Sequence, residues 1–327
     1  MSKDLSIAKR QMTTTKATKA QIILGFLTIY LVWSSTYLAI RFVVETIPPF
    51  MMAGLRFLLG GMLFYGWAKL RGAGNPQKKH WLPMGLIGLG LIVGGNGGVS
   101  WAEQVVPSGL TALMIAVVPL WIVLADWIRP GGKRPGGIVM LGLALGFIGM
   151  LFLINPLNIS SEREIDALGA AVLVFATMSW ATGSIYSRHA PAPKSQILGV
   201  GMQMLIGGAA LLVISGFSGE FANFETAQIT TKSFFAFIYL TTIGSFAFGV
   251  YLWLLKASTP ARVATYAYVN PVLALVLGTV FAAEPFTLWT FGCSLVIITA
   301  VVIIVNARKT PQEHADTKEA LAPARSE

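Results

Sequence analysis

Trp33-Ser-Ser-Thr-Tyr-Leu-Ala-Ile-Arg41 has a counterpart 147 residues later, Trp180-Ala-Thr-Gly-Ser-Ile-Tyr-Ser-Arg188, in which tryptophan and arginine are again eight residues apart. A second pair of stretches has almost the same offset. Ser108-Gly-Leu-Thr-Ala-Leu-Met-Ile-Ala-Val-Val-Pro119 is matched 152 residues later by Pro260-Ala-Arg-Val-Ala-Thr-Tyr-Ala-Tyr-Val-Asn-Pro271. The chain therefore contains an internal repeat, and its two halves should form the same elements in the same order.

The composition indicates that most of this chain lies in a lipid bilayer. Of its 327 residues, 55% are hydrophobic and 12% are charged, whereas about 25% are charged in a typical soluble domain. Ten apolar runs are long enough to cross a hydrocarbon core of about 30 Å. Their limits are 21–40, 49–68, 82–102, 108–128, 136–155, 167–187, 196–216, 233–255, 260–281 and 286–306. The single cysteine, Cys293, lies in one of these runs, which excludes a disulfide framework.

Lysine and arginine determine the predicted orientation, because cytoplasmic loops of membrane proteins are enriched in them. With the N-terminus in the cytoplasm, the cytoplasmic segments hold 20 of the 24 Lys and Arg residues. Arg41, Arg163 and Lys232 then remain for the outer loops, and Arg56 for a helix interior. The same distribution explains the net charge of +10 without a nucleic-acid partner.

The predicted fold is an all-α integral membrane protein with ten transmembrane helices in two five-helix repeats. Five crossings per repeat is an odd number, so the second repeat enters the membrane with inverted topology, a common plan among transporters. The expected segments are a cytoplasmic arm at 1–20, the repeats at 21–155 and 167–306, and a disordered cytoplasmic tail at 307–327, whose mixed charges with Ala and Pro cannot bury a core.

Four motifs carry a resemblance to a known family: Trp33-Ser-Ser-Thr-Tyr, Pro48-Pro49 followed by Arg56-Phe57, Val106-Pro107-Ser108-Gly109, and Tyr266-Ala-Tyr-Val-Asn-Pro271. In this order they resemble the drug/metabolite transporter superfamily, most of all its EamA-type members and, among these, the YedA-like proteins of bacterial inner membranes. The resemblance covers residues 21–306. It implies ten helices, two EamA repeats, and export of small metabolites such as amino acids. The family's Glu after the fourth and ninth helices has a counterpart in Glu284, but Gly131 and Gly132 stand in that region of the first half.

Polar and aromatic side chains inside the predicted helices are the candidates for a substrate cavity, because hydroxyl, indole and amide groups in a bilayer need partners. These candidates are Trp33, Asn96, Met114, Trp180, Tyr251, Tyr266 and Asn270. Asn96 lies within Gly94-Gly95-Asn96-Gly97-Gly98, whose glycines permit either a tight helix crossing or a cavity wall with exposed backbone. Pro119 and Pro271 occupy matching places, and each leaves one helical carbonyl without its donor. We expect both prolines to act as kinks that let the halves move.

Arg56 and Glu103 are the candidates for an ion pair. Arg56 is the only Lys or Arg well inside a predicted helix, and a cation there must pair or reach water. Glu103 lies at a similar depth, at the outer end of the third helix. The pair would either pin the second helix to the third or take part in proton coupling. Because no acidic residue or His lies near the centre of a predicted helix, a uniporter is favoured, with protonation of Glu103 as the alternative.

The predicted function is a secondary transporter that exports small metabolites across a bacterial inner membrane by alternating access, with both termini in the cytoplasm. The expected partners are a small-molecule substrate and the lipid bilayer. No cofactor or metal is expected, and the chain would act as a monomer or homodimer. The alternative is a flippase for lipids or lipid-linked sugars with the same architecture. A membrane-embedded enzyme is disfavoured, because the sequence has no P-loop, His-Glu-x-x-His or Gly-x-Ser-x-Gly motif and no catalytic cluster near one surface.

Overall fold

The computed structural model describes residues 18–128, 131–132, 134–154, 166–187, 189–258, 263 and 265–307. Within these ranges every regular element is a helix, and no strand occurs. The predicted arm at 1–20, the outer segment at 155–166 and the tail at 307–327 lie outside the described residues, apart from the few positions next to a helix.

Each repeat contributes five spans. The first has α2 (Lys19–Val43), α3 (Pro49–Leu70), the continuous series α4 (Lys78–Gly88), η1 (Leu89–Gly97) and α5 (Gly98–Ala102), the pair α6 (Ser108–Ile115) and α7 (Val118–Ile128), and α8 (Gly137–Ile154). The second has α9 (Ala167–Ser187), α10 (Gln196–Phe217), the series α12 (Thr231–Tyr239), η3 (Leu240–Gly244) and α13 (Ser245–Ala257), then α15 (Tyr266–Ala282) and α16 (Leu288–Ala307). The short helices α11 (Glu220–Asn223) and η2 (Thr226–Gln228) lie between α10 and α12.

The spans follow the apolar runs of the sequence. In the part of the chain that the structure describes, nine helical stretches are long and apolar enough to cross a membrane, and α15 is a shorter apolar helix. The all-helical membrane fold predicted from the sequence is thereby confirmed. The boundaries agree to within a few residues except at the ninth span. The sequence predicts its start at 260, whereas α15 begins at Tyr266, and residues 259–262 and 264 lie outside the described residues.

Three spans depart from a regular α-helix. η1 and η3 are π-helical turns at corresponding places in the third and eighth spans, and such turns are frequent at functional sites. Two side chains bond to carbonyls of η1: Asn96 Nδ2 donates to Leu91 at 3.1 Å, and Ser179 Oγ of α9 donates to Gly90 at 2.9 Å. The fourth span is interrupted between α6 and α7, just before Pro119.

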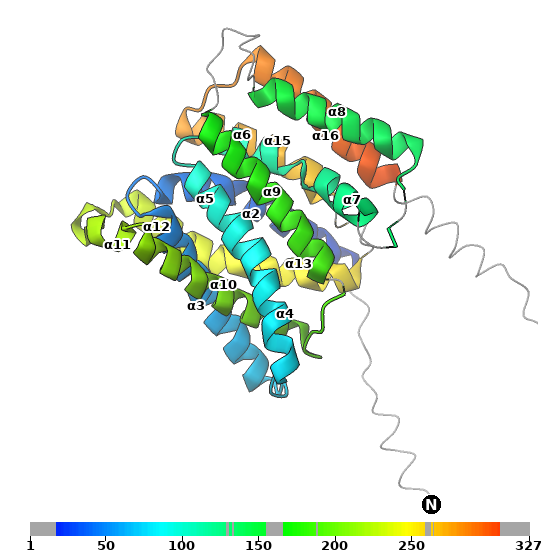
Figure 1. The fold of residues 1–327 in the computed structure, drawn as a ribbon. Helices are drawn as coiled ribbons and strands as arrows, with labels where there is room; N and C mark the ends of the chain where they lie inside the picture. The colour runs from blue at the N-terminus through cyan, green and yellow to red at the C-terminus, as the bar shows by residue number, and fades with distance from the viewer. Residues whose placement is uncertain are drawn as a thin grey trace, which may run out of the picture.

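The two repeats pack as a pseudo-twofold pair. Spans at equivalent places contact one another: α3 with α10, α8 with α16, and α6 with α15. Other contacts between the repeats come in equivalent pairs. The first span, α2, packs against α12 and α13 of the eighth span, and η1 and α5 of the third span pack against α9, the sixth span. In Figure 1, α8 and α16 lie side by side at one edge of the bundle, and α3 and α10 lie toward the opposite edge.

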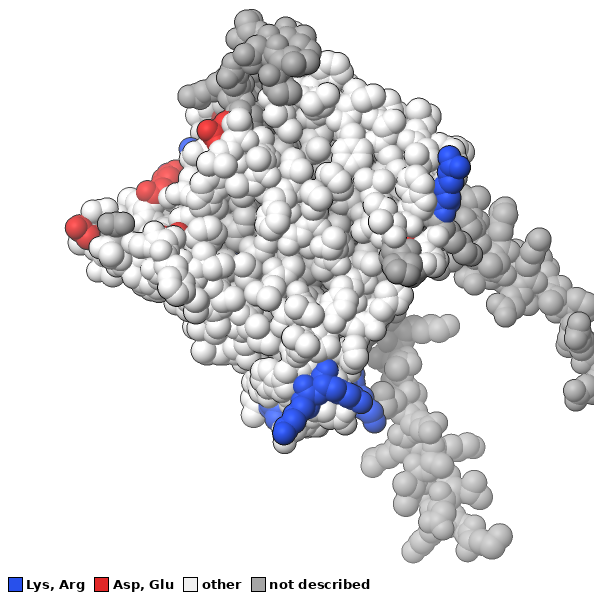
Figure 2. All heavy atoms as spheres, viewed as in Figure 1, with Lys and Arg blue, Asp and Glu red and all other residues white. Residues whose placement is uncertain are grey.

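Charge distinguishes the two ends of the bundle. Figure 2 shows Asp and Glu gathered toward the end that carries α11 and α12, and Lys and Arg mainly at the other end. We call these the acidic end and the basic end. By the order of the spans, the acidic end has Glu45, Asp166, Glu220, Glu225 and Glu284 near the helix ends, and the basic end has Lys19, Lys69, Arg71, Lys78, Lys79, Arg134 and Lys194. α2 begins and α16 ends at the basic end (Figure 1).

Candidate functional site

Three of the predicted cavity residues form one aromatic cluster where α2, α13 and α15 meet. The ring centroids of Trp33 and Tyr251 are 4.9 Å apart, and those of Trp33 and Tyr266 are also 4.9 Å apart, with the rings at right angles. Tyr251 and Tyr266 complete the triangle edge to face at 6.0 Å. Because α2 belongs to the first repeat and the other two helices to the second, the cluster lies across the boundary between the repeats. Its rings provide a flat, amphipathic surface.

The other four cavity candidates lie elsewhere in the interior. Trp180 packs against η1, since a Cβ placed on Gly95 would lie 2.9 Å from the Trp180 ring. Asn96 lies in the same turn, where its amide bonds to a carbonyl. Met114 of α6 and Asn270 of α15 are buried, and no described residue gives Asn270 Oδ1 a hydrogen bond. The structure thus joins three candidates in the aromatic cluster and places Trp180 beside the turn that holds Asn96. Access of all seven candidates to one common space stays a prediction.

The two prolines have different surroundings. Pro119 is the second residue of α7, and Ala116 and Val117 before it form a turn that interrupts the fourth span. Pro271 lies inside α15, which continues from Tyr266 to Ala282 without a break. A role for both prolines in movement of the repeats stays a prediction.

Arg56 and Glu103 do not form the predicted ion pair in this conformation. In the part of the chain that the structure describes, both carboxylate oxygens of Glu103 are buried without a hydrogen-bond partner, and so is Nη1 of Arg56. The guanidinium carbon of Arg56 instead lies 4.8 Å from the centroid of the Phe57 ring. The prediction rested on depth in the membrane, and side chains at one depth on neighbouring helices can point to different neighbours. The two groups are still close enough to interact electrostatically.

Arg41, by contrast, contacts Glu103 through the main chain. The sequence places Arg41 in an outer loop, but it lies in the last turn of α2. Its Nη1 donates to the carbonyl oxygens of Glu103 at 2.5 Å and Gln104 at 3.0 Å. The last carbonyl groups of a helix have no donor within the helix, so Arg41 satisfies the end of the third span and ties it to the first.

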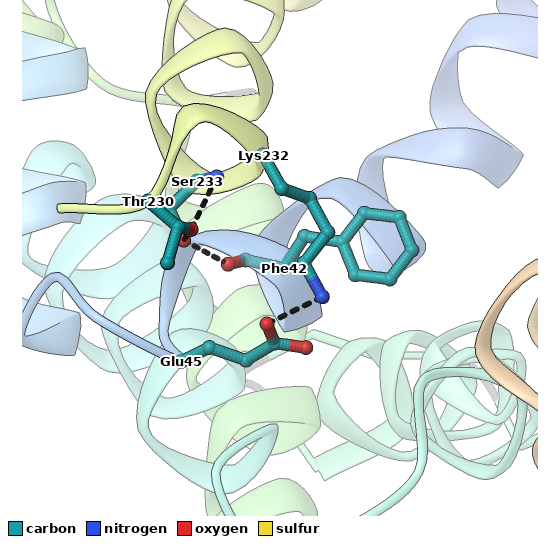
Figure 3. Close-up of polar contacts among 5 residues, drawn as sticks. All are labelled: Phe42, Glu45, Thr230, Lys232 and Ser233. Carbon is teal, nitrogen blue, oxygen red and sulfur yellow. Dashed lines mark hydrogen bonds and ion pairs between the residues drawn. The ribbon is translucent and has the colours of Figure 1, made fainter.

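Five residues at the acidic end join α2 to α12, and we call them the latch: Phe42, Glu45, Thr230, Lys232 and Ser233 (Figure 3). Lys232 Nζ lies 2.5 Å from Glu45 Oε2 and 4.5 Å from the centroid of the Phe42 ring. Ser233 Oγ donates to the Phe42 carbonyl at 2.7 Å. Thr230 caps α12 by accepting from the Ser233 N–H at 3.2 Å. Because α2 and α12 belong to different repeats, the latch holds the repeats together.

Glu284 makes a second contact between the repeats at the acidic end. It follows the end of α15, where Ala283 adopts the left-handed backbone conformation with φ of 51°. Its carboxylate accepts from the N–H groups of Ser108 at 2.6 Å and Gly109 at 2.9 Å, at the start of α6. The first N–H groups of a helix lack partners and carry partial positive charge, so a carboxylate is favourable there.

Glu220 makes the same kind of contact at the start of α3. Its carboxylate accepts from Phe50 N–H at 3.1 Å and Met51 N–H at 2.7 Å. Like Glu284, it belongs to the second repeat and satisfies a helix of the first. The acidic end is therefore closed by the latch and by two carboxylates that each cap a helix of the other repeat.

Open space lies at the surface of the bundle in this conformation. A crevice of about 420 Å³ follows α2 and α13, with Thr28 and Trp253 in its walls. A second crevice, of about 330 Å³, lies between α3 and α13, with Phe64 and Phe246 in its walls. Neither crevice is lined by the rings of the aromatic cluster. Among the described residues, no group of three His, Cys, Asp or Glu side chains could hold a metal ion.

Sequence reasoning did not find the contacts that close the acidic end. By sequence, Glu220 and Lys232 are ordinary loop charges, and Ser233 is the first residue of a span. Glu284 alone carried a signal, through the family pattern after the ninth helix. The residues that meet lie 176 positions apart for Glu284 and Ser108, and 191 apart for Ser233 and Phe42. Such contacts depend on how the repeats pack, which no local pattern specifies.

Comparison with known proteins accounts for this architecture. The EamA-like transporter family matches residues 20–155 and again residues 167–306, so that both repeats are covered. The chain belongs to this family. The resemblance to EamA-type proteins in the sequence is thereby confirmed, and this EamA protein is a transporter with a multi-pass membrane fold.

Relatives of this EamA protein are named as transporters. The "Uncharacterized inner membrane transporter YedA" of Escherichia coli (strain K12) is 37% identical over 278 residues, 84% of this chain and 88% of that protein. The "Uncharacterized transporter YvbV" of Bacillus subtilis (strain 168) is 25% identical over 302 residues, 91% and 95% of the two chains. The "Probable amino-acid metabolite efflux pump" of Escherichia coli (strain K12) is 24% identical over 299 residues, 85% and 93% of the two chains.

A solved structure shares the fold. Described only as the crystal structure of a protein, it matches 90% of this chain with the whole of its own, at a TM-score of 0.58 and 20% identity. At this level of identity the likeness concerns the fold alone.

Proposed function

We propose that this EamA protein is a secondary transporter that exports small metabolites, such as amino acids or related compounds, across the bacterial inner membrane by alternating access. The two repeats would rock about the pseudo-twofold axis and expose a central site to one side at a time. The basic end and both termini would face the cytoplasm, because an end rich in Lys and Arg stays on that side of the membrane.

The observation that carries the proposal is the closure of the acidic end by contacts between the repeats. The latch and the carboxylates of Glu220 and Glu284 hold the second repeat onto the first. Deeper in the bundle the repeats meet through the aromatic cluster, whose ring contacts can separate without leaving a buried charge. Polar contacts of this kind can break and form again in water, so the two repeats can separate at the acidic end. This conformation would then be the state that is closed to the outside.

Two observations support a neutral or zwitterionic substrate. The aromatic cluster offers ring faces, a hydroxyl-bearing edge and an indole rather than a charge. A relative with 24% identity is named an amino-acid metabolite efflux pump. Amino acids with apolar or aromatic side chains therefore stand first among the compounds to test.

Flux in proteoliposomes tests the proposal. The full-length protein is reconstituted, the vesicles are loaded with a panel of labelled aromatic and aliphatic amino acids, and efflux is compared with that from protein-free vesicles. We expect efflux of at least one compound down its own gradient. Tyr266→Ala removes one wall of the aromatic cluster and should weaken apparent affinity about tenfold, the equivalent of about 1.4 kcal/mol.

Tyr186→Ala is the matched control, since Tyr186 lies on α9 with 40% of its surface exposed. It should transport as the unaltered protein does. Equal losses in the two variants would contradict a role for the cluster, and absence of efflux for every compound from folded protein would contradict the proposed substrate class.

A further inference from the structure

Glu103 is a buried acidic residue without a partner for its carboxyl group. It is the residue after the end of α5, and its exposed fraction is 0%. Among the described residues, neither of its side-chain oxygens has a hydrogen-bond partner. An ionised carboxylate that is removed from water without donors is strongly disfavoured, whereas a neutral carboxyl group is tolerated far better. This geometry favours the protonated form.

Ionisable groups face Glu103 from several helices. They are Tyr37 and Arg41 from α2, Arg56 from α3, and Glu284 after the end of α15. α9 packs against α5, and its ionisable groups are Asp166 before its first residue and Tyr186 near its other end. The guanidinium of Arg41 is bonded to main-chain carbonyls, so the nearby cations do not neutralise the carboxyl by direct contact.

The electrostatics of the site agree with its geometry. Burial raises the pKa of Glu103 well above the ordinary value, and the charge of Glu284 raises it further, while Arg41 and Arg56 oppose the rise. The ordinary pKa of a glutamate in water is about 4.3. The same carboxyl would therefore bind a proton tightly when enclosed and weakly when water reaches it.

We propose that Glu103 is a proton-binding site that is occupied while the acidic end is closed. The inference rests on the proposed alternating access. When the acidic end opens, water reaches the carboxyl, its O–H bond breaks, and the proton passes to outer water, leaving a carboxylate. When the end closes, the carboxylate takes one proton back from outer water. In the open state the carboxylate is hydrated and faces two cations, Arg41 and Arg56, on adjacent helices.

Linkage gives the direction of the pH effect. The closed state binds the proton more tightly, so lowering the pH favours the closed state and raising the pH favours the open state. Between the two pKa values of Glu103, the ratio of closed to open molecules falls about tenfold for each unit of rising pH.

The test measures opening of the acidic end without any substrate. Cys293 is replaced by Ser, and spin labels are attached at Gln104→Cys in the first repeat and Ala227→Cys in the second, both exposed at the acidic end. The full-length protein is reconstituted in lipid nanodiscs, and label-to-label distances are recorded by pulsed electron resonance from pH 5 to pH 9. The only ligand varied is the proton.

In the unaltered background we expect the shorter-distance population to grow as the pH falls. Glu103→Gln, which cannot ionise, should stay closed and lose the pH dependence. Glu225→Gln changes an exposed acid at the same end and should keep it. Arg56→Met removes a cation that opposes the rise in the pKa of Glu103, so the midpoint of the change from closed to open should move to higher pH. This variant still tests the proposal if Glu103→Gln does not fold.

Two results would overturn the proposal: distances that do not change with pH in the unaltered background, or a pH dependence that survives in Glu103→Gln. The flux experiment is separate from this one. Amino-acid efflux together with an acidic end that does not respond to pH would support the proposed transport function and contradict the proton site. A pH response that depends on Glu103, without amino-acid efflux, would support the proton site and contradict the proposed substrate class.

Discussion

Glu284 and Glu220 show how one side chain can join the two repeats of a membrane protein. Each carboxylate accepts two main-chain hydrogen bonds in the first turn of a helix that belongs to the other repeat. Such bonds are charge-assisted, and they lie where the helix dipole favours negative charge. Each residue therefore stabilises the start of a helix and the contact between the repeats at the same time.

Removal of the Glu284 carboxylate should lower the stability of the folded protein. Glu284→Ala leaves two N–H groups of α6 without their acceptor, and we expect a loss of about 1–2 kcal/mol. Thermal or denaturant unfolding in detergent, followed by tryptophan fluorescence, measures the loss. Glu225→Ala is the control, because Glu225 is exposed and its side chain contacts Gln228 of the same loop. Its effect should stay within about 0.5 kcal/mol.

Gly278 should be required for the same cap. A Cβ at this position would lie 2.2 Å from Glu284 Oε2 and 2.9 Å from its Cδ, so Gly278→Ala would push the carboxylate away from α6. The two substitutions remove one interaction, and their effects on the free energy of unfolding should not add. A double variant that loses the full sum of the two single effects would show that Gly278 acts through other contacts.

At the scale of helices, the sequence predicts the spans better than their interruptions. The apolar runs locate the spans because a bilayer requires about 20 consecutive apolar residues of a helix. The glycines around Asn96 mark the π-helical turn η1 as an unusual segment. Its counterpart η3, Leu240–Gly244, has one glycine and no comparable local signal. η3 lies at the place in the eighth span that η1 has in the third, so the repeat relates the two turns although the local sequence does not.

The candidate site was predictable to the same limited extent. Trp33, Tyr251 and Tyr266 lie on helices that pack together, and the structure brings their rings into contact. Arg56 and Glu103 are expected from the sequence at comparable depth, yet the Arg56 guanidinium lies over the Phe57 ring and the Glu103 carboxyl has no hydrogen-bond partner among the described residues. Depth follows from position along an apolar run, but lateral direction depends on which helices become neighbours, and a single sequence does not specify that.

The pair of α3 and α10 should tolerate no added methyl group at its closest approach. A Cβ at Gly208 of α10 would lie 2.6 Å from Leu58 N of α3, a backbone atom that cannot turn aside. Gly208→Ala should therefore lower stability by about 1–3 kcal/mol, the usual effect of overpacking. Gly66 of α3 has nothing within 4 Å of its ideal Cβ. Gly66→Ala should be neutral or raise stability by about 0.5–1 kcal/mol, and destabilisation by Gly66→Ala would show that the helix, not the contact, is sensitive.

At the scale of the whole molecule, two kinds of contact hold the latch closed, and they should differ in strength. Lys232 and Glu45 have side chains that are 49% and 38% exposed, and an ion pair this accessible contributes about 0–1 kcal/mol. Ser233 is fully buried and satisfies the Phe42 carbonyl near the end of α2. Losing the donor to a carbonyl in these partly buried surroundings costs up to about 3 kcal/mol.

Ser233→Ala should therefore open the acidic end more than Glu45→Gln does. A difference of about 1–2 kcal/mol corresponds to a factor of about 5–30 in the open fraction. The rate at which a small thiol reagent modifies Ser100→Cys, a buried position of α5, from the acidic side measures that fraction. High salt should mimic Glu45→Gln, because it screens an exposed pair, and should leave the effect of Ser233→Ala unchanged. An equal or greater effect of Glu45→Gln at low salt would reverse this ranking.

The two carboxylate caps also affect how the protein matures on the ribosome. Translation delivers the first repeat before the second, so α3 and α6 enter the bilayer before Glu220 and Glu284 exist. The N–H group of Ser108 at the start of α6 has its acceptor, Glu284, 176 residues later in the chain, so this hydrogen bond forms only after the second repeat is made. During that interval the nascent first repeat is an unfinished assembly, with helix starts that water, lipid headgroups or an insertase must accommodate. Its biogenesis is complete only when the loop that carries Glu284 has joined the first repeat at the acidic end.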